Sequence, residues 1–319
     1  MTEDSSGGCE HKHIAELSLF GKNIKVKNYL CSKNDCPYKE KPKPLELQLS
    51  IIPTFYCGGH CSFCSAASNS GKKGFLDLKK LEIVLKELYS KRALRGISIT
   101  GGEPFTDIVL LNEIIEMIFD ITGIETEISI NTNGSALNKL KGIKRLSFVD
   151  AIHISRHHYD DDRNRAYFGI DVADADEIRN MAGIVNDPKL FVFNCLLLAD
   201  GIGNKDEMLK FLEFAGDVGI PKVGFVTPMT INDYTRNNKV SYTEIFDRND
   251  PRMLLTTAFR DYDQCRCQDG VFVTEKGRLV EFYGRETLYG SPEYARGLVY
   301  GADNVLRTGF SQDASIVWE

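Results

Sequence analysis

The chain has 319 residues, of which 42% are hydrophobic and 26% are charged, and its formal net charge is -6 at pH 7. This composition suits one large α/β domain with an appendage, or two modest domains. No stretch approaches the roughly 18 consecutive apolar residues of a membrane helix, and no basic block suits a nucleic-acid backbone. Residues 1–12 lack the basic start and apolar core of a secretory signal. We therefore expect a cytoplasmic protein whose partners include neither membrane nor nucleic acid.

Residues 1–46 are predicted to form a loose tail and then a cysteine-containing segment, with a short strand at 24–30 and a loop that holds Cys31 and Cys36. From residue 47 the chain alternates between strand-like and amphipathic helix-like runs, which predicts a parallel sheet with helical crossovers. The predicted strands are 47–55, 96–100, 126–131, 149–155, 190–198 and 222–227, and the predicted helices are 76–90, 107–121, 136–145, 173–185 and 205–216.

The predicted strands are polar on one face. In the third strand, Glu127, Ser129 and Asn131 alternate with Ile128 and Ile130. Parallel strands buried on both faces usually read as continuous apolar runs. Here the apolar face is expected to pack on helices while the polar face lines a cavity, because buried polar groups need partners. We therefore expect residues 47–227 to form a partial (β/α)6 barrel of parallel strands in an α/β fold.

Residues 228–319 are less regular and are predicted to form a small C-terminal extension that contains β-structure. The runs 271–274 and 279–283 flank Glu275-Lys276-Gly277, which is typical of a β-hairpin. Cys265 and Cys267 open this extension. If the two ends of the chain meet, a second iron–sulfur cluster or a zinc ion could be held there by Cys31, Cys36, Cys265 and Cys267. Four unconnected thiols are the alternative.

Three further cysteines follow the first predicted barrel strand on a glycine-rich loop: Cys57, Cys61 and Cys64. Clustered thiols in a reducing cytosol indicate metal binding or catalysis. Three thiolates around a four-iron cluster would leave one iron open to a cofactor or substrate. A structural zinc or iron–sulfur knuckle is the alternative, although zinc sites prefer paired spacings and four protein ligands. The spacing, with Phe63 just before the last cysteine, resembles the signature of the radical S-adenosylmethionine (SAM) superfamily.

This resemblance covers about residues 47–227. It implies that a 4Fe–4S cluster, bound by the three cysteines, reductively cleaves SAM to a 5′-deoxyadenosyl radical. The radical then abstracts a hydrogen atom from the substrate, and an electron donor such as flavodoxin or ferredoxin supplies the electron. The resemblance also implies that Phe63 packs near the adenine of SAM.

Further candidate cofactor-binding residues stand where predicted strands end. Gly101, Gly102, Glu103 and Pro104 follow the second strand. The glycines permit close approach of the backbone, and Glu103 can accept hydrogen bonds from the ammonium group of SAM. In the superfamily the next strand ends often contact the ribose and carboxylate of SAM, and Arg156 could neutralise that carboxylate. The candidates there are Asn131, Asn133, Ser155 and Arg156, with an ordinary turn or surface pair as the alternative.

Two candidate catalytic residues, His157 and Tyr159, follow the fourth strand at the expected cavity mouth. They could bind substrate or transfer protons, and a solvated loop is the alternative. In the fifth strand, alternation places Asn194 on the inward polar face as a further cofactor-binding candidate. The same alternation points Cys195 outward, so we interpret it as a core thiol and not as a radical quencher.

Three functions remain open. The first is a biosynthetic radical SAM enzyme acting on a small molecule, such as a nucleoside, sugar or amino-acid derivative. The second is a peptide-modifying radical enzyme. Its leader-binding domain often has ~80 residues, and the 46 residues before the predicted barrel favour the first function. The third is a non-catalytic iron–sulfur sensor or binding protein, which explains neither residues 101–104 nor the polar strand faces.

Overall fold

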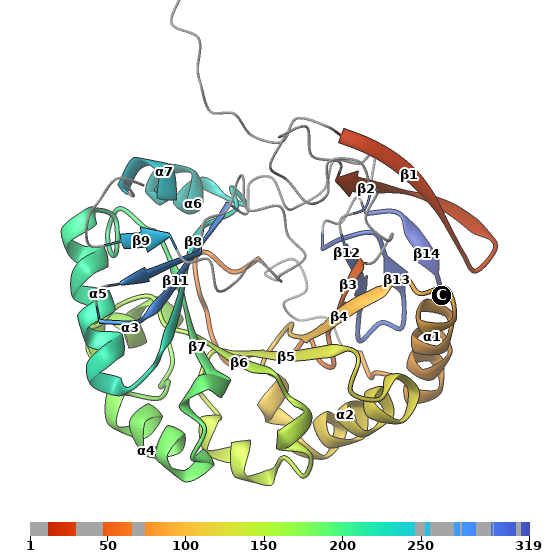
Figure 1. The fold of residues 1–319 in the computed structure, drawn as a ribbon, viewed down its shortest axis with the longest axis horizontal. Helices are drawn as coiled ribbons and strands as arrows, with labels where there is room; N and C mark the ends of the chain where they lie inside the picture. The colour runs from red at the N-terminus through yellow and green to blue at the C-terminus, as the bar shows by residue number, and fades with distance from the viewer. Residues whose placement is uncertain are drawn as a thin grey trace, which may run out of the picture.

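The computed structural model describes residues 12–29, 47–65, 74–245, 253–255, 271–274, 276–284, 295, 297–310 and 314–319. One sheet of 12 strands dominates it, in the order β14-β13-β12-β3-β4-β5-β6-β7-β8-β11-β10-β9. The sheet curves into an open arc with helices on its outer side (Figure 1). None of the helices in the described ranges has both the length and the apolar character needed to cross a membrane.

The six predicted barrel strands are present and are mutually parallel. Their side-chain alternation gives each strand one apolar face, and these faces join the large core beneath the helices. The strands are β3 (Leu47–Ile51), β4 (Leu94–Ile99), β5 (Glu127–Thr132), β6 (Ala151–Ser155), β7 (Phe191–Leu196) and β8 (Lys222–Thr227).

Two later strands extend the parallel sheet beyond the six predicted ones. β11 (Leu279–Gly284) pairs in parallel with β8, and β12 (Gly297–Tyr300) pairs in parallel with β3. The C-terminal extension therefore contributes to the barrel sheet at both of its edges. β10 and β11 form the predicted hairpin, in which Gly277 has a φ of 76°. The antiparallel outer strands are β9 (Met253–Leu255), β10 (Val271–Thr274), β13 (Leu306–Arg307) and β14 (Ile316–Trp318).

Four of the five predicted helices are observed, and they cover the outer face of the arc (Figure 1). The first begins after Asp77, whose carboxylate accepts hydrogen bonds from the backbone N–H groups of Lys79 and Lys80. Its apolar stripe is buried on the sheet. These helices are α1 (Leu78–Ser90), α2 (Ile108–Thr122), α4 (Ala175–Val185) and α5 (Lys205–Val218).

The structure differs from the predicted helices in two places. The range 136–145 forms short 3₁₀ turns, and an unpredicted helix, α3 (Asp161–Phe168), replaces the expected loop after β6. Asp160 caps the start of α3, and Gly169, with a φ of 66°, ends it. The remaining short elements are α6 (Asp233–Asn238), α7 (Tyr242–Ile245), and the 3₁₀ turns η2 (Pro104–Thr106), η3 (Leu137–Gly142), η4 (Leu146–Phe148) and η5 (Pro188–Leu190).

A separate hairpin precedes the barrel, formed by β1 (Lys12–Leu19) and β2 (Lys22–Tyr29). It packs against α1 and the C-terminal strands. The ring of Phe20 stacks on Trp318 of β14, with 5.1 Å between ring centroids, and Leu19 and Val26 are buried in the main core. The strand predicted at 24–30 is therefore one half of a longer hairpin.

Candidate active site

Polar side chains line the inner face of the arc, as strand alternation predicts. Ser155 of β6 stands beside Asn194 of β7, and Asn131 of β5 stands beside His153 of β6. All four side chains are partly exposed. The amide Nδ2 of Asn131 donates to the Oγ of Ser98, 2.7 Å away. Cys195, the next residue after Asn194, lies fully buried in the outer core, which confirms the predicted orientation of these two residues.

The same inner face carries an ion pair that the sequence analysis did not predict. Lys222 of β8 and Glu281 of β11 lie 2.8 Å apart (Nζ to Oε1). Gly224 stands between Asn194 and Glu281 in the sheet and leaves that part of the wall without a side chain. No local sequence pattern predicts this pair, because Glu281 lies on β11, a C-terminal strand that joins the barrel sheet beside β8.

The three clustered thiols gather on the loop after β3. The Sγ atoms of Cys57 and Cys61 flank Gly59, at 3.5 and 3.7 Å from the point where a Cβ would stand. Burial, then the neighbouring Cys64 and Cys57 thiols, raise the pKa of the Cys61 thiol to about 12. None of these cysteines forms a disulfide. The loop 57–64 is called the cluster loop below.

The cluster loop offers three cysteine thiols as metal ligands. A four-iron cluster can be held by three cysteine thiolates, each on a different iron. The donor set therefore fits the 4Fe–4S group that the sequence implies.

Two contacts from distant elements hold the cluster loop. The backbone N–H of His60 donates to the carbonyl of Phe168 at the end of α3 (2.8 Å). The side-chain Nδ2 of Asn232, just before α6, donates to the carbonyl of Ser62 (2.7 Å). Sequence reasoning missed both partners. The acidic start and terminal glycine of α3 were the available signal for the first of them.

Phe63 packs within an aromatic group. Its ring meets His157 edge-on at 4.7 Å and lies 6.0 and 6.2 Å from the rings of Tyr167 and Phe168. The ring of His157 stacks on Phe168 in turn, at 5.1 Å. α3 and the residues that follow β6 thus pack against the cluster loop.

The two candidate catalytic residues, His157 and Tyr159, follow β6 and hydrogen-bond to β7 and to α5. His157 is buried, and its Nδ1 accepts a hydrogen bond from the backbone N–H of Leu196 (3.2 Å). The hydroxyl of Tyr159 donates to Glu207 of the outer helix α5 (2.8 Å). His157 thus lies against Phe63 of the cluster loop, and Tyr159 lies against α5. The catalytic role expected of these residues stays a prediction.

Arg156 is buried against α5. It follows the buried Ile152 and Ile154 on the outer side of the strand and is only 1% exposed. Its guanidinium pairs with Asp161 and donates to three backbone carbonyls. It also lies 4.8 Å from the ring of Phe214 on α5. These partners hold the guanidinium outside the barrel, so the structure does not support the expected contact with the carboxylate of SAM.

Gly101 and Gly102 are needed for packing against the stem of the cluster loop. Gly101 has a φ of 115°. A Cβ on Gly102 would stand 1.9 Å from the carbonyl oxygen of Tyr56. The N–H of Gly102 donates to the carbonyl of Thr54 (3.1 Å), and that of Glu103 donates to Tyr56 (2.9 Å). The glycines thus bring β4 against the residue that precedes Cys57.

The carboxylate of Glu103 is fully buried and accepts hydrogen bonds from the protein itself. Oε1 accepts from the Thr132 hydroxyl (2.8 Å) and the Phe105 N–H (3.1 Å), and Oε2 accepts from the Asn133 N–H (2.8 Å). Burial raises the pKa of Glu103, while these donors oppose the shift. These hydrogen bonds brace η2, which starts at Pro104, against the end of β5, and the ammonium contact expected from the sequence stays a prediction.

Replacing Glu103 with glutamine is expected to lower the free energy of unfolding by about 1–3 kcal/mol. In the variant, the side-chain amide of the new glutamine would point its N–H₂ group at a hydrogen-bond donor that now meets a carboxylate oxygen. Two donors would then face each other, and both would be buried without an acceptor. Denaturant unfolding of the variant would measure the change. Glu127→Gln, the same substitution at an exposed position of β5, serves as the control. Equal stability of the two variants would contradict the bracing role.

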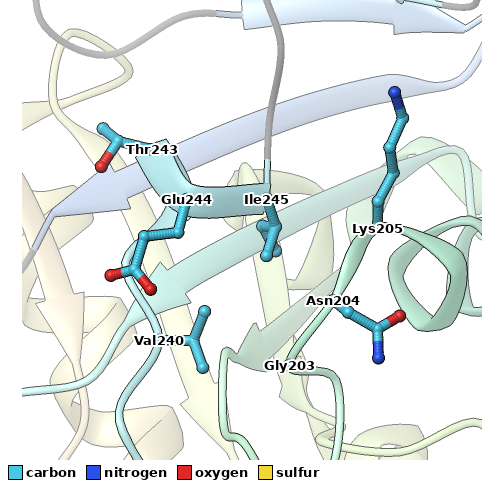
Figure 2. Close-up of a pocket in the computed structure, with 7 residues that line it drawn as sticks. All are labelled: Gly203, Asn204, Lys205, Val240, Thr243, Glu244 and Ile245. Atoms are coloured by element: carbon cyan, nitrogen blue, oxygen red, sulfur yellow. The ribbon is translucent and has the colours of Figure 1, made fainter.

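The possible second metal site lies outside the described residues, since all of Cys31, Cys36, Cys265 and Cys267 fall in ranges that the structure does not describe. Figure 2 shows a different feature, a pocket of about 600 Å³ between the start of α5 and α7. The pocket contains no predicted site residue and no part of the cluster loop. The residues that line the pocket are Gly203, Asn204, Lys205, Val240, Thr243, Glu244 and Ile245.

The comparison with known families decides the identity of the barrel. The family model of the radical SAM superfamily matches residues 51–238, which include the cluster loop, Gly101 to Pro104 and β4 to β8. This chain belongs to the radical SAM superfamily. Membership makes it a radical SAM enzyme and implies SAM and a 4Fe–4S cluster as its cofactors.

This radical SAM enzyme is similar to several archaeal proteins. A probable GTP 3′,8-cyclase from Pyrococcus abyssi is 27% identical over 172 residues, which are 53% of this chain and 53% of that protein. Another, from Sulfolobus acidocaldarius, is 31% identical over 112 residues, 35% of this chain and 34% of that protein. The chain thus spans about half the length of the curated relatives it matches.

Two solved structures align with part of this chain. Streptococcus suis SuiB bound to its precursor peptide SuiA aligns with a TM-score of 0.48 and 18% identity, over 61% of this chain and 42% of that one. The structure of native anSMEcpe with bound AdoMet aligns with a TM-score of 0.44 and 16% identity, over 59% of this chain and 55% of that one.

Proposed function

We propose that this radical SAM enzyme cleaves SAM reductively and abstracts a hydrogen atom from a small organic molecule in a biosynthetic pathway. One observation carries the proposal. The three thiols of the cluster loop stand at the rim of a partial barrel whose inner face carries polar side chains on β4 to β7 and an ion pair between β8 and β11. Ligands of parallel α/β barrels bind at the carboxyl ends of the strands, and the cluster loop begins at such an end.

The residues divide into those that would hold the cofactors and those that hold the loop. Cys57, Cys61 and Cys64 would bind the 4Fe–4S cluster, which when bound supplies the electron for SAM cleavage. Glu103 and the two preceding glycines position the loop stem. The residues that we propose to contact SAM or substrate are Asn131, Ser155 and Asn194, because their side chains face the barrel interior.

The inner wall favours a polar small molecule as substrate. Its serine and asparagine side chains offer uncharged hydrogen-bonding groups, and Lys222 forms an ion pair with Glu281. The relatives from Pyrococcus abyssi and Sulfolobus acidocaldarius, named probable GTP 3′,8-cyclases, make nucleotides the first class to test.

We propose a flavodoxin or ferredoxin as the electron donor and the cytoplasm as the location.

The decisive experiment is SAM cleavage by the reconstituted enzyme. The cluster is assembled anaerobically, dithionite and SAM are added, and 5′-deoxyadenosine is measured by chromatography with mass detection. We expect it to form only in cluster-loaded protein, with iron-free protein as the control. Deuterated GTP tests the substrate class, because a deuterium atom abstracted from GTP appears in the 5′-deoxyadenosine. Fully loaded protein that forms no more 5′-deoxyadenosine than the iron-free control would refute the proposed function.

A further inference from the structure

A side-chain amide contacts one of the three clustered thiols. The Nδ2 of Asn133, at the end of β5, lies 3.4 Å from the Sγ of Cys57. This is a hydrogen-bonding distance for a sulfur acceptor, whose radius exceeds that of oxygen. The two residues come from different strand ends and are 76 positions apart in the sequence. Folding of the sheet therefore brings a hydrogen-bond donor to a cluster ligand.

The amide of Asn133 is held in this orientation by its other contacts. Its Oδ1 accepts from the backbone N–H of Ser135 (2.8 Å), and its own backbone N–H donates to Oε2 of Glu103 (2.8 Å). Because Oδ1 is used by a backbone donor, the amide nitrogen faces the sulfur. The network thus assigns the oxygen and nitrogen positions of this amide. The fully buried Glu103 fixes the backbone from which the side chain extends.

We propose that Asn133 raises the reduction potential of the cluster by donating a hydrogen bond to the Cys57 thiolate. This role rests on the proposed function, because Cys57 must bind the cluster. A donor to a ligating sulfur withdraws electron density and stabilises the reduced, more negatively charged cluster over the oxidised one. Asn133 is then a positioning and tuning residue that eases reduction of the cluster. From the sequence we expect Asn133 to contact SAM, whereas the role proposed here is a hydrogen bond to Cys57.

A matched pair of Asn→Ser variants isolates this hydrogen bond. In Asn133→Ser the shorter hydroxyl can still accept from Ser135 N–H, as Ser does in such turns, but it no longer reaches Cys57. Asn232→Ser removes the amide that donates to the carbonyl of Ser62. It keeps an acceptor for the N-cap bond to Thr235. Both variants lose an amide donor to the cluster loop, and only the first loses a donor to sulfur.

The measurement is the midpoint potential of the cluster, obtained without SAM by redox titration of the reduced cluster's EPR signal. For Asn133→Ser we expect the ratio of reduced to oxidised cluster at a fixed potential to fall about three- to tenfold. This corresponds to a midpoint about 30–60 mV more negative for a one-electron couple. Asn232→Ser is expected to keep the wild-type midpoint. Incomplete loading does not disturb the comparison, because the midpoint is independent of the loaded fraction.

Three results would overturn this role of Asn133. One is a wild-type midpoint in Asn133→Ser, and another is an equal shift in both variants, which would assign the effect to loosening of the loop. The third is complete loss of the cluster in both Asn133→Ser and Asn133→Asp while Asn232→Ser loads normally. Asn133 would then be needed to hold the cluster and not to tune it. If the proposed function itself is wrong, the experiments give a different result: the cluster would still show a midpoint potential, but no 5′-deoxyadenosine would form.

Discussion

Replacing Cys57 with alanine is expected to abolish both the cluster and SAM cleavage. The substitution leaves two thiolates on the loop, so one further iron of the cluster loses its protein ligand. Iron and sulfide content should fall well below that of the wild type, and 5′-deoxyadenosine formation should drop to the level of iron-free protein. Metal analysis, visible absorption and the 5′-deoxyadenosine assay measure these losses together.

Cys195→Ala is the control for this substitution. Its thiol is fully buried in the outer core, and burial raises its pKa well above the ordinary value. We expect this variant to keep wild-type iron content and activity and to lose on the order of 1 kcal/mol of stability. If Cys57→Ala instead retained the cluster and its activity, the cluster loop would not be the metal site.

Replacing Gly102 with alanine is expected to displace the cluster loop, lowering the free energy of unfolding by about 3 kcal/mol and reducing the iron content. The new Cβ would stand 1.9 Å from the carbonyl oxygen and 2.6 Å from the carbonyl carbon of Tyr56. Both are backbone atoms, and the oxygen accepts the hydrogen bond from Glu103. Such overlap cannot be relieved by a side-chain rotation, so the segment next to Cys57 must move.

Gly183→Ala tests whether any glycine-to-alanine change has this effect. Gly183 lies in α4, where a Cβ would meet nothing within 4 Å. Alanine is preferred to glycine within a helix, so this variant should be more stable by about 0.5–1 kcal/mol. Thermal or denaturant unfolding, together with iron content after reconstitution, measures both variants. A Gly102→Ala protein with wild-type stability and iron content would show that the loop stem tolerates the overlap.

Local pattern was sufficient for the strands and for the direction of their side chains. Alternation in 190–198 places Cys195 in the core and Asn194 on the inner face, and the structure agrees. The same rule, continued one residue beyond β6, also assigns Arg156 to the outer side. The expected SAM contact of Arg156 came from the family resemblance and not from alternation. In the structure the guanidinium of Arg156 pairs with Asp161.

The sequence by itself determined the six central parallel strands, the polar inner face and the three-cysteine loop, because each depends on periodicity or on spacing within a few residues. Only the tertiary structure decided what surrounds that loop. Phe168, Asn232 and Asn133 reach it from other parts of the chain, and β11 and β12 join the sheet from the C-terminal region. Contacts between residues far apart in sequence arise only when the sheet assembles, so no local pattern encodes them.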